Sequence, residues 1–309
     1  MRIRAYQLAK WLVPRVPLAV SYRVAELAGD LIWYFARSVR QNFEHNQQRA
    51  LGPTATPNEI TQSSRHALRH LAKLYVDEFR IPALSKEEIR RSITIHGLQH
   101  LEEAYAKEQG VILVSAHYGA ISMVGQMLAV LNYPTMIAVE HVKPEPVFRF
   151  MCELRTSHGL RLLPIDKPLI GLVRTLRKQK GVVALAVDRN VSQTGIRMPF
   201  LGEETLVPCG AIQLAILTGS PIVVSYCRRL PNYGYEAFVK KPFYVDKRHY
   251  STVDQAIYEG TAKVMAHLEA FIREQPSQWV MSVPLWKDSK TQDEDSSSYM
   301  NPTTVNGQY

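Results

Sequence analysis

Residues 110–122 read Gly110-Val-Ile-Leu-Val-Ser-Ala-His117-Tyr-Gly119-Ala-Ile-Ser122. The apolar run predicts a buried strand, and the histidine follows it in a turn that contains glycine. A second apolar segment, of helical character, begins after this turn. Ligands of parallel sheets bind beyond the carboxyl ends of the strands, where the next helices begin. His117 is therefore a candidate catalytic residue.

Similar apolar or β-rich runs alternate with helix-like segments along the chain. We expect strands over 92–96, 111–116, 135–139, 161–165, 182–187 and 221–226, and helices over 98–107, 121–131, 145–158, 168–179, 209–218 and 253–274. Ser85 and Glu88 form a capping-box pattern before the first strand. A turn over 231–234 leads to a further strand over 235–239, expected to be antiparallel and at an edge. This alternation predicts an α/β fold with a central, mostly parallel or mixed sheet flanked by helices.

Three regions are expected: an N-terminal, amphipathic and membrane-associating helical region over 1–90, an α/β domain over 91–287, and a disordered polar tail over 288–309. The formal net charge is +9 and the isoelectric point is about 9.4. The first fifty residues carry eight basic and three acidic side chains among many apolar ones. An anionic membrane surface is the expected partner.

The charges of this region interrupt the apolar residues too often for a membrane span, and interfacial helices fit better. A helical hairpin packed on the core would show the same pattern, and both interpretations stay open. A nucleic-acid-binding module is the weaker alternative, because no platform of aromatic and basic residues is present. We therefore expect no nucleic acid among the partners.

Polar residues follow three of the predicted strands, at His117, Glu140 and Asp188. The chain lacks the nucleophile elbow, the dinucleotide fingerprint, the P-loop and the zincin motif, and no cysteine spacing predicts a metal site. A histidine that titrates near neutral pH can deprotonate an alcohol, whose oxygen then attacks an activated acyl carbonyl. The pattern therefore favours acyl transfer without a metal and without a covalent enzyme intermediate.

Several motifs around this stretch carry a resemblance to a known family. They are Ile95-His-Gly97-Leu-Gln-His-Leu101, Ala138-Val-Glu140-His-Val-Lys-Pro144-Glu145, the segment 155–159, Val187-Asp188-Arg189-Asn190, Pro199-Phe200-Leu-Gly202, Pro208-Cys-Gly210-Ala211 and Gln275-Pro276-Ser-Gln-Trp279. Together with His117 they resemble the lysophospholipid acyltransferase superfamily, and within it the lipid A biosynthesis acyltransferases, over most of residues 1–287. The motif around Glu140 is more similar to the phosphatidylinositol mannoside acyltransferases than to the lauroyl and myristoyl transferases.

This resemblance implies a glycerolphosphate-acyltransferase-like fold and a peripheral or monotopic enzyme on the cytoplasmic face of the plasma (inner) membrane. It implies transfer of a fatty acyl chain to a hydroxyl of a glycolipid or phospholipid acceptor. The donor would be acyl-CoA or acyl-carrier protein, as a co-substrate, with no cofactor. Ile121, Met123 and Met127, on the helix after His117, are expected to line an apolar groove for the acyl chain.

The resemblance also assigns catalytic roles to individual residues. His117 matches the family's general base. Glu140 matches a polar site residue that could supply a negative charge to the histidine, and Arg155 matches one that could bind phosphate or a developing oxyanion.

Four further residues match positions linked to substrate binding. Asp188 and Arg189 match an Asp-rich turn at the site rim, although an aspartate often only caps a turn. Phe200 and Gly202 would shape the acyl or acceptor groove by close approach of the backbone, or would form an ordinary tight turn.

One catalytic position departs from the family, because its usual Asp or Glu falls on Ser122, whose hydroxyl can orient the histidine ring but brings no countercharge. A carboxylate there would fix the histidine tautomer and stabilise the imidazolium, and removing an equivalent group from a serine protease triad costs about 10⁴ in rate. Either a carboxylate outside the local motif serves His117, or the chain is a non-catalytic lipid-binding relative.

Overall fold

The computed structural model describes residues 2–166, 168–191 and 195–286. The expected tail over 288–309 lies outside the described residues. The helices are α1 (Arg2–Leu12), α2 (Leu18–Phe35), α3 (Arg37–Leu51), α4 (Pro57–Arg80), α5 (Lys86–Ser92), α6 (Leu98–Tyr105), α7 (Ile121–Val130), α8 (Glu145–Arg155), α9 (Ile170–Arg177), α10 (Gly210–Thr218) and α11 (Val253–Glu274), with 3₁₀ turns at Val13–Arg15, Ile81–Ala83, Lys247–His249 and Pro276–Gln278. The strands are β1 (Ile93–His96), β2 (Val111–Ser115), β3 (Thr135–Val139), β4 (Arg161–Pro164), β5 (Val182–Ala186), β6 (Ile196–Phe200), β7 (Glu203–Val207), β8 (Ile222–Arg229) and β9 (Tyr235–Val239).

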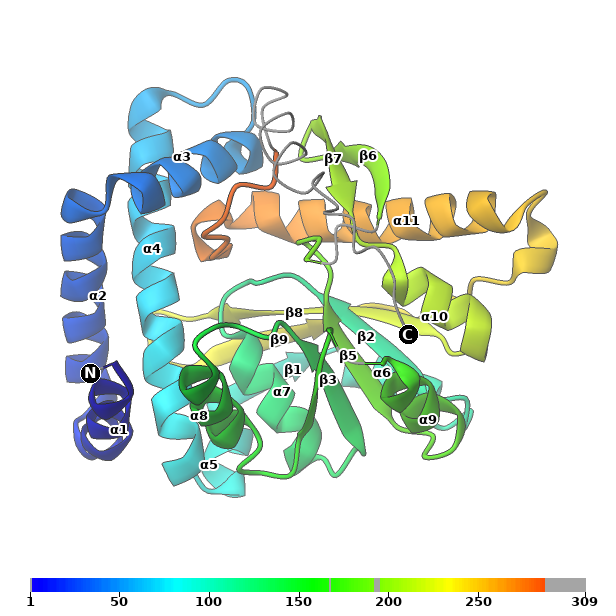
Figure 1. Cartoon of the computed structure of the whole chain (residues 1–309), viewed down its shortest axis with the longest axis horizontal. Helices are drawn as coiled ribbons and strands as arrows, with labels where there is room; N and C mark the ends of the chain where they lie inside the picture. The colour runs from blue at the N-terminus through cyan, green and yellow to red at the C-terminus, as the bar shows by residue number, and fades with distance from the viewer. Residues whose placement is uncertain (1, 167, 192–194, 287–309) are drawn as a thin grey trace, which may run out of the picture.

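The predicted α/β fold is confirmed (Figure 1). Seven strands form one mixed sheet in the order β1-β9-β8-β2-β5-β3-β4. The five strands from β8 to β4 run parallel, and β9 pairs antiparallel with β8. The Ser85–Glu88 capping box at the start of α5 is also confirmed.

Two features of the sheets differ from the sequence-based expectation. The strand β9 is antiparallel, as predicted, but it is not at an edge, because β1 pairs with it on its free side. A short strand gives no sign in its own sequence of which partner it takes. The second feature is the hairpin β6–β7, which was not predicted. Its two-residue turn, Leu201 and Gly202, has φ angles of 53° and 91°, as type I′ hairpin turns require.

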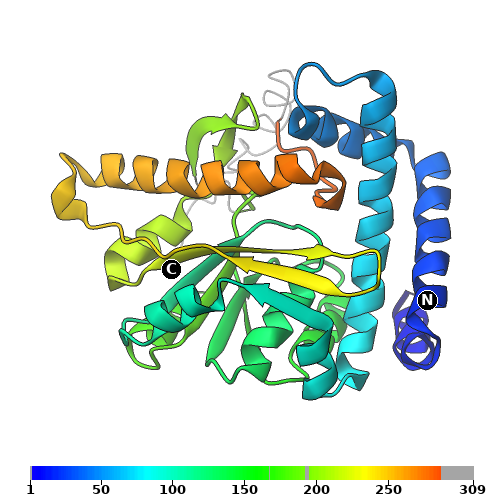
Figure 2. The ribbon, with the colours of Figure 1, turned by 180° about the vertical axis from the view of Figure 1, so that it is seen from behind.

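Helices cover both faces of the main sheet. On one face, Leu176 of α9, Ile212 of α10 and Leu268 of α11 share a buried cluster with side chains of β2, β5 and β8. On the other face, Leu101 of α6 and Met123 of α7 belong to two further buried clusters. Figures 1 and 2 show α11 on one side of the sheet and α5 and α7 on the other.

The N-terminal helices lie against the end of this α/β unit. Both views show α4 between α2 and the sheet (Figures 1 and 2). Tyr22 and Trp33 on one side of α2 are buried, whereas Leu27 and Leu31 on the opposite side are 64% and 58% exposed. The helices thus pack on the core and still present an apolar surface. Within the described ranges, no helix has the length and apolar character needed to cross a membrane.

A buried ion pair fastens this N-terminal region to the sheet. Asp77 of α4 pairs with Arg229 of β8, and both side chains are nearly inaccessible to solvent. The hydroxyls of Tyr22 on α2 and Tyr235 on β9 donate to the same carboxylate, at 2.6 and 2.8 Å. Burial by itself would lower the pKa of Arg229, but the charge of Asp77 raises it, so the guanidinium stays charged.

Replacing Asp77 with alanine should therefore destabilise the fold strongly. Arg229 would keep its charge in the interior without an acidic partner, and breaking a buried ion pair typically costs about 3–5 kcal/mol. Chemical denaturation followed by circular dichroism measures the change in the free energy of unfolding. Tyr235→Phe removes only one hydrogen bond to the same carboxylate and should cost about 1 kcal/mol. A loss no greater for Asp77→Ala than for this control would contradict the prediction.

Candidate functional site

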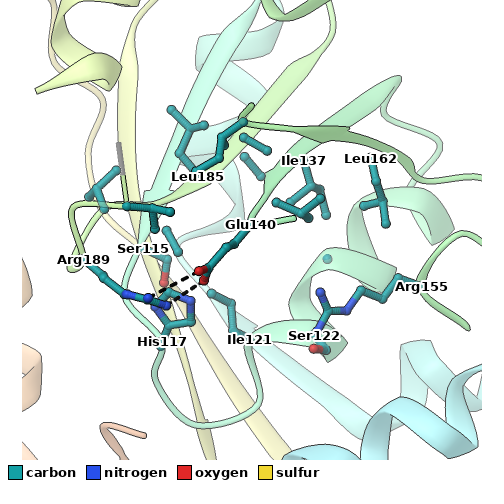
Figure 3. Close-up of a pocket in the computed structure, with 18 of the residues that line it drawn as sticks. Ser115, His117, Ile121, Ser122, Ile137, Glu140, Arg155, Leu162, Leu185 and Arg189 are labelled. Carbon is teal, nitrogen blue, oxygen red and sulfur yellow. Dashed lines mark hydrogen bonds and ion pairs between the residues drawn. The ribbon is translucent and has the colours of Figure 1, made fainter. Parts of the chain in front are cut away.

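The ends of three neighbouring strands bring the predicted rim residues together. His117 follows β2, Asp188 follows β5 and Glu140 follows β3, and these strands lie side by side in the sheet in the order β2-β5-β3. Because the strands are parallel, their carboxyl ends meet at one edge. His117, Glu140 and Arg189 line a cavity of about 1070 Å³ at this edge (Figure 3).

Asp188 is the partner of His117. Its Oδ1 lies 2.8 Å from His117 Nδ1, and its Oδ2 accepts hydrogen bonds from the His117 backbone N–H and from Trp279 Nε1, both at 2.9 Å. The carboxylate can only accept, so Nδ1 carries the hydrogen and Nε2 keeps a lone pair. The Asp188 side chain is fully buried, whereas that of His117 is 43% exposed and lines the cavity.

The electrostatics of this pair follow from its burial and its short distance. Desolvation by itself would lower the pKa of His117, but the charge and hydrogen bond of Asp188 outweigh it and raise the pKa above its usual value. Burial would raise the pKa of Asp188, yet the histidine, Trp279 and the backbone N–H of His117 keep it below its usual value. Asp188 therefore remains a carboxylate and stabilises positive charge on the imidazole.

The loop after β2 is held by the segment that follows α11. The backbone N–H of Val280 donates to the carbonyl of His117, and that of Gly119 donates to the carbonyl of Gln278. Gly119 has a φ of +56°, and a Cβ there would lie 1.9 Å from the carbonyl oxygen of Cys227 on β8. Only glycine fits this approach. The closing motif Gln275–Trp279 thus supports the histidine through backbone contacts and through the Trp279 indole.

Among the described residues, no hydrogen bond or ion pair joins Glu140 to His117. Glu140 forms an ion pair with Arg189, whose Nη1 lies 2.6 Å from Glu140 Oε2. The expectation that Glu140 could supply a negative charge to His117 is therefore corrected: the carboxylate bound to the imidazole is that of Asp188. Figure 3 shows the Glu140–Arg189 pair beside His117. Asp188, expected at the rim as a substrate-binding residue, instead lies behind the histidine, while Arg189 lines the cavity.

Ser122 and Arg155 meet on another wall of the cavity (Figure 3). Their common partner is Glu78 of α4, which accepts a hydrogen bond from Ser122 Oγ at 2.5 Å and pairs with Arg155 Nη2 at 2.8 Å. Sequence reasoning missed Glu78, because it lies inside a long amphipathic helix with no motif around it. Its only sequence signal was its position in the helical region, next to Asp77.

Phe200 and Gly202 lie away from the cavity. Phe200 is fully buried and packs against Trp279 and Trp286. Gly202 is in the β6–β7 turn, with no atom near the position of a Cβ. The structure thus agrees with the tight-turn interpretation, and neither residue lines the cavity with His117.

The remaining walls of the cavity are largely apolar. They come from both helix layers, with Leu74, Val147 and Met151 from α4 and α8 and with Leu172 and Leu214 from α9 and α10. Ile121 lines the cavity as expected, together with Val124 and Leu128 of the same helix. Met123 and Met127 point elsewhere and pack in a core cluster with residues of α5, β1 and β9. Among the described residues, no group of three or more His, Cys, Asp or Glu side chains could hold a metal ion.

Comparison with known proteins identifies the family of this chain. A family model described as "Bacterial lipid A biosynthesis acyltransferase" matches residues 3–288. A protein of Mycobacterium tuberculosis named phosphatidylinositol mannoside acyltransferase is 27% identical over 262 residues, which cover 82% of this chain and 79% of that protein. A protein of the same name from Mycolicibacterium smegmatis is 26% identical over 255 residues, which cover 80% and 79%. The chain therefore belongs to the bacterial lipid A biosynthesis acyltransferase family and is an acyltransferase.

Proposed function

We propose that this protein is a membrane-associated O-acyltransferase that uses His117 as its general base. The observation that carries the proposal is the His117–Asp188 pair, with Nδ1 bound to a buried carboxylate and the imidazole at the wall of a large, mostly apolar cavity. Such a cavity suits a fatty acyl chain, and the paired histidine suits removal of a proton from a hydroxyl.

In the proposed reaction, Nε2 of His117 takes the proton of the acceptor hydroxyl as its oxygen attacks the thioester carbonyl carbon. The carbonyl π electrons move to the oxygen and form a tetrahedral intermediate. When the carbonyl re-forms, the carbon–sulfur bond breaks, and the thiolate takes the proton from the imidazolium. The products are an ester and a free thiol. Asp188 stabilises the imidazolium and fixes the tautomer throughout.

The charged groups around the cavity suit the polar parts of the two substrates. Arg189, oriented by Glu140, lines the cavity on the side of His117, and Arg155 lines the wall with Ser122. Guanidinium groups bind phosphate and stabilise developing oxyanions. We assign to these two arginines the binding of anionic groups of the donor and acceptor.

The proposed acceptor is a glycolipid or phospholipid with a free hydroxyl, and the proposed donor is acyl-CoA or acyl-carrier protein. The support for a mannosylated phosphatidylinositol as acceptor is the name of the relatives and the Glu140 motif. The non-catalytic alternative rested on the missing carboxylate at Ser122. Asp188 argues against this alternative, because it gives His117 a buried acidic partner.

The test is an acyl-transfer assay with purified protein, mannosylated phosphatidylinositol in mixed micelles, and radiolabelled palmitoyl-CoA or palmitoyl-carrier protein. We expect label in the lipid with release of one thiol per ester, and only background with His117→Ala. A parallel assay with phosphatidylinositol that carries no mannose measures how far the transfer depends on the mannose of the acceptor. Label that remains on the thioester with every acceptor would contradict the proposed function.

We further propose that α1 and α2 bind this enzyme to the cytoplasmic face of the plasma (inner) membrane as a peripheral or monotopic protein. Their outer side presents large exposed apolar residues, among them Trp11, Val24, Leu27, Leu31 and Phe35. Basic residues of the same region would meet anionic lipid head groups. Tyr6 of α1 lines the cavity, so a lipid substrate would enter from the same side.

Vesicle sedimentation tests this membrane contact. Leu27→Ser/Leu31→Ser should lower partitioning onto vesicles of phosphatidylglycerol and phosphatidylethanolamine at least about tenfold, because inserted leucine side chains contribute about 1.5–3 kcal/mol each. Val253→Ser/Tyr258→Ser, at similarly exposed positions of α11, is the matched control and should bind like the wild type. Equal binding by both double variants would contradict the proposal.

A further inference from the structure

Ser122 stands where the family motif has an acid, and the structure places another acid against it. Glu78 belongs to α4, and its Oε1 accepts a hydrogen bond from Ser122 Oγ of α7 at 2.5 Å. The Glu78 side chain is only 1% exposed. A carboxylate buried to this extent requires charged or hydrogen-bonding partners. Ser122 is one of them, and the second is Arg155.

Arg155 is bound to Glu78 through two of its three nitrogens. Nε lies 2.9 and 3.1 Å from the two carboxylate oxygens, and Nη2 lies 2.8 Å from Oε1. Burial would lower the pKa of Arg155, but the charge of Glu78 raises it, so the guanidinium stays charged at the cavity wall. The backbone of Arg155 is fixed separately, because Gln126 Nε2 of α7 donates to its carbonyl at 2.9 Å.

We propose that Glu78 replaces, from helix α4, the acid that the family motif carries at position 122. Resting on the function proposed above, Glu78 acts as a positioning residue: it sets the direction of the Arg155 guanidinium, and Ser122 holds Glu78 in place. Asp188 serves His117, so the acid missing at position 122 is not needed by the histidine. The site therefore contains two buried acids, Asp188 beside His117 and Glu78 beside Arg155. Neither acid belongs to the segment 117–122.

Positions 78 and 122 are so close that only one of them can carry an acidic side chain without repulsion. The Ser122 hydroxyl is already at hydrogen-bond distance from Glu78. An aspartate at 122 would therefore place a second carboxylate against the first, and like charges this close disfavour each other strongly in a site of low dielectric. A serine beside a glutamate, or an aspartate beside a small polar residue, would each give Arg155 one negative partner.

A reciprocal exchange of the two side chains tests this proposal. Glu78→Ser should lower kcat/KM about 10²-fold, the scale expected when a site group is misplaced by about 1 Å. Ser122→Asp alone should also lower it, because the two carboxylates repel. The double variant Glu78→Ser/Ser122→Asp should recover at least tenfold over Glu78→Ser. Glu87→Ser, at an exposed acid of α5, is the control and should match the wild type.

Thermal unfolding gives a second measure that needs no substrate. Glu78→Ser leaves Arg155 without its acid and should lower the melting temperature, and Ser122→Asp in that background should raise it again. Glu78→Gln, which keeps the volume, replaces Glu78→Ser if that variant does not fold. Folded Glu78 variants with wild-type kcat/KM, or a double variant no better than Glu78→Ser in both measures, would overturn the proposal. An inactive wild type would instead reject the proposed function.

Discussion

His117→Ala is expected to lower kcat by about 10²–10⁴-fold, the contribution that general acid–base catalysis by a positioned side chain usually makes. The variant lacks the group that takes the proton from the acceptor hydroxyl and returns it to the thiolate. Removing the imidazole leaves the cavity walls and both arginines in place, so KM should change much less than kcat. Initial rates of ester formation at several acceptor concentrations separate the two constants.

The matched control for this variant is His249→Ala. His249 lies exposed in the 3₁₀ turn before α11, at the surface and outside the cavity lining. It should have the rate of the wild type. If His117→Ala retained more than a tenth of the wild-type kcat while folded, the base would have to be another group.

Asp188→Asn is expected to lower kcat as much as about 10⁴-fold, as the equivalent change does in a serine protease triad. The amide can donate to Nδ1, which favours the tautomer with the hydrogen on Nε2, and that tautomer cannot accept the proton of the hydroxyl. The imidazolium would also lose its negative partner. The His117 backbone N–H and Trp279 Nε1 both donate to Oδ2 of Asp188, and the amide oxygen of an asparagine can still accept these two hydrogen bonds. The loop that carries His117 should therefore remain in place.

The pH profile of this variant distinguishes a charged partner from a merely structural one. His117 acts as a base only when it is neutral, so kcat/KM of the wild type should fall as the pH drops through the pKa of His117, which Asp188 raises above its usual value. Asp188→Asn removes the charge that raises this pKa, and the acidic limb should therefore move to lower pH. Asp254→Asn, at the exposed start of α11, should leave the limb unchanged. An unmoved limb in Asp188→Asn would show that Asp188 does not set the charge of His117.

The contrast between Asp188 and Glu140 shows why the partner of His117 was not predicted. In the sheet, Ser115 of β2 is in register with Ala186 of β5, so residues two positions further, 117 and 188, lie beside each other. Glu140 follows β3, which pairs with β5 and not with β2. Both acids follow apolar strands and look alike in sequence, and only the order of the strands decides which one reaches the histidine.

The sequence by itself determined most strands and helices of the α/β domain and the edge of the sheet at which its site forms, but not the hairpin β6–β7. The periodicity of apolar residues is local, and so it predicts strands, helices and the polar residues at strand ends, as with His117 after β2. Tertiary structure alone decided the pairing of side chains across 71 residues for Asp188 and 44 residues for Glu78, and the place of β9 inside the sheet. These contacts depend on strand order and helix packing, which bring together groups whose own sequence surroundings carry no sign of their partners.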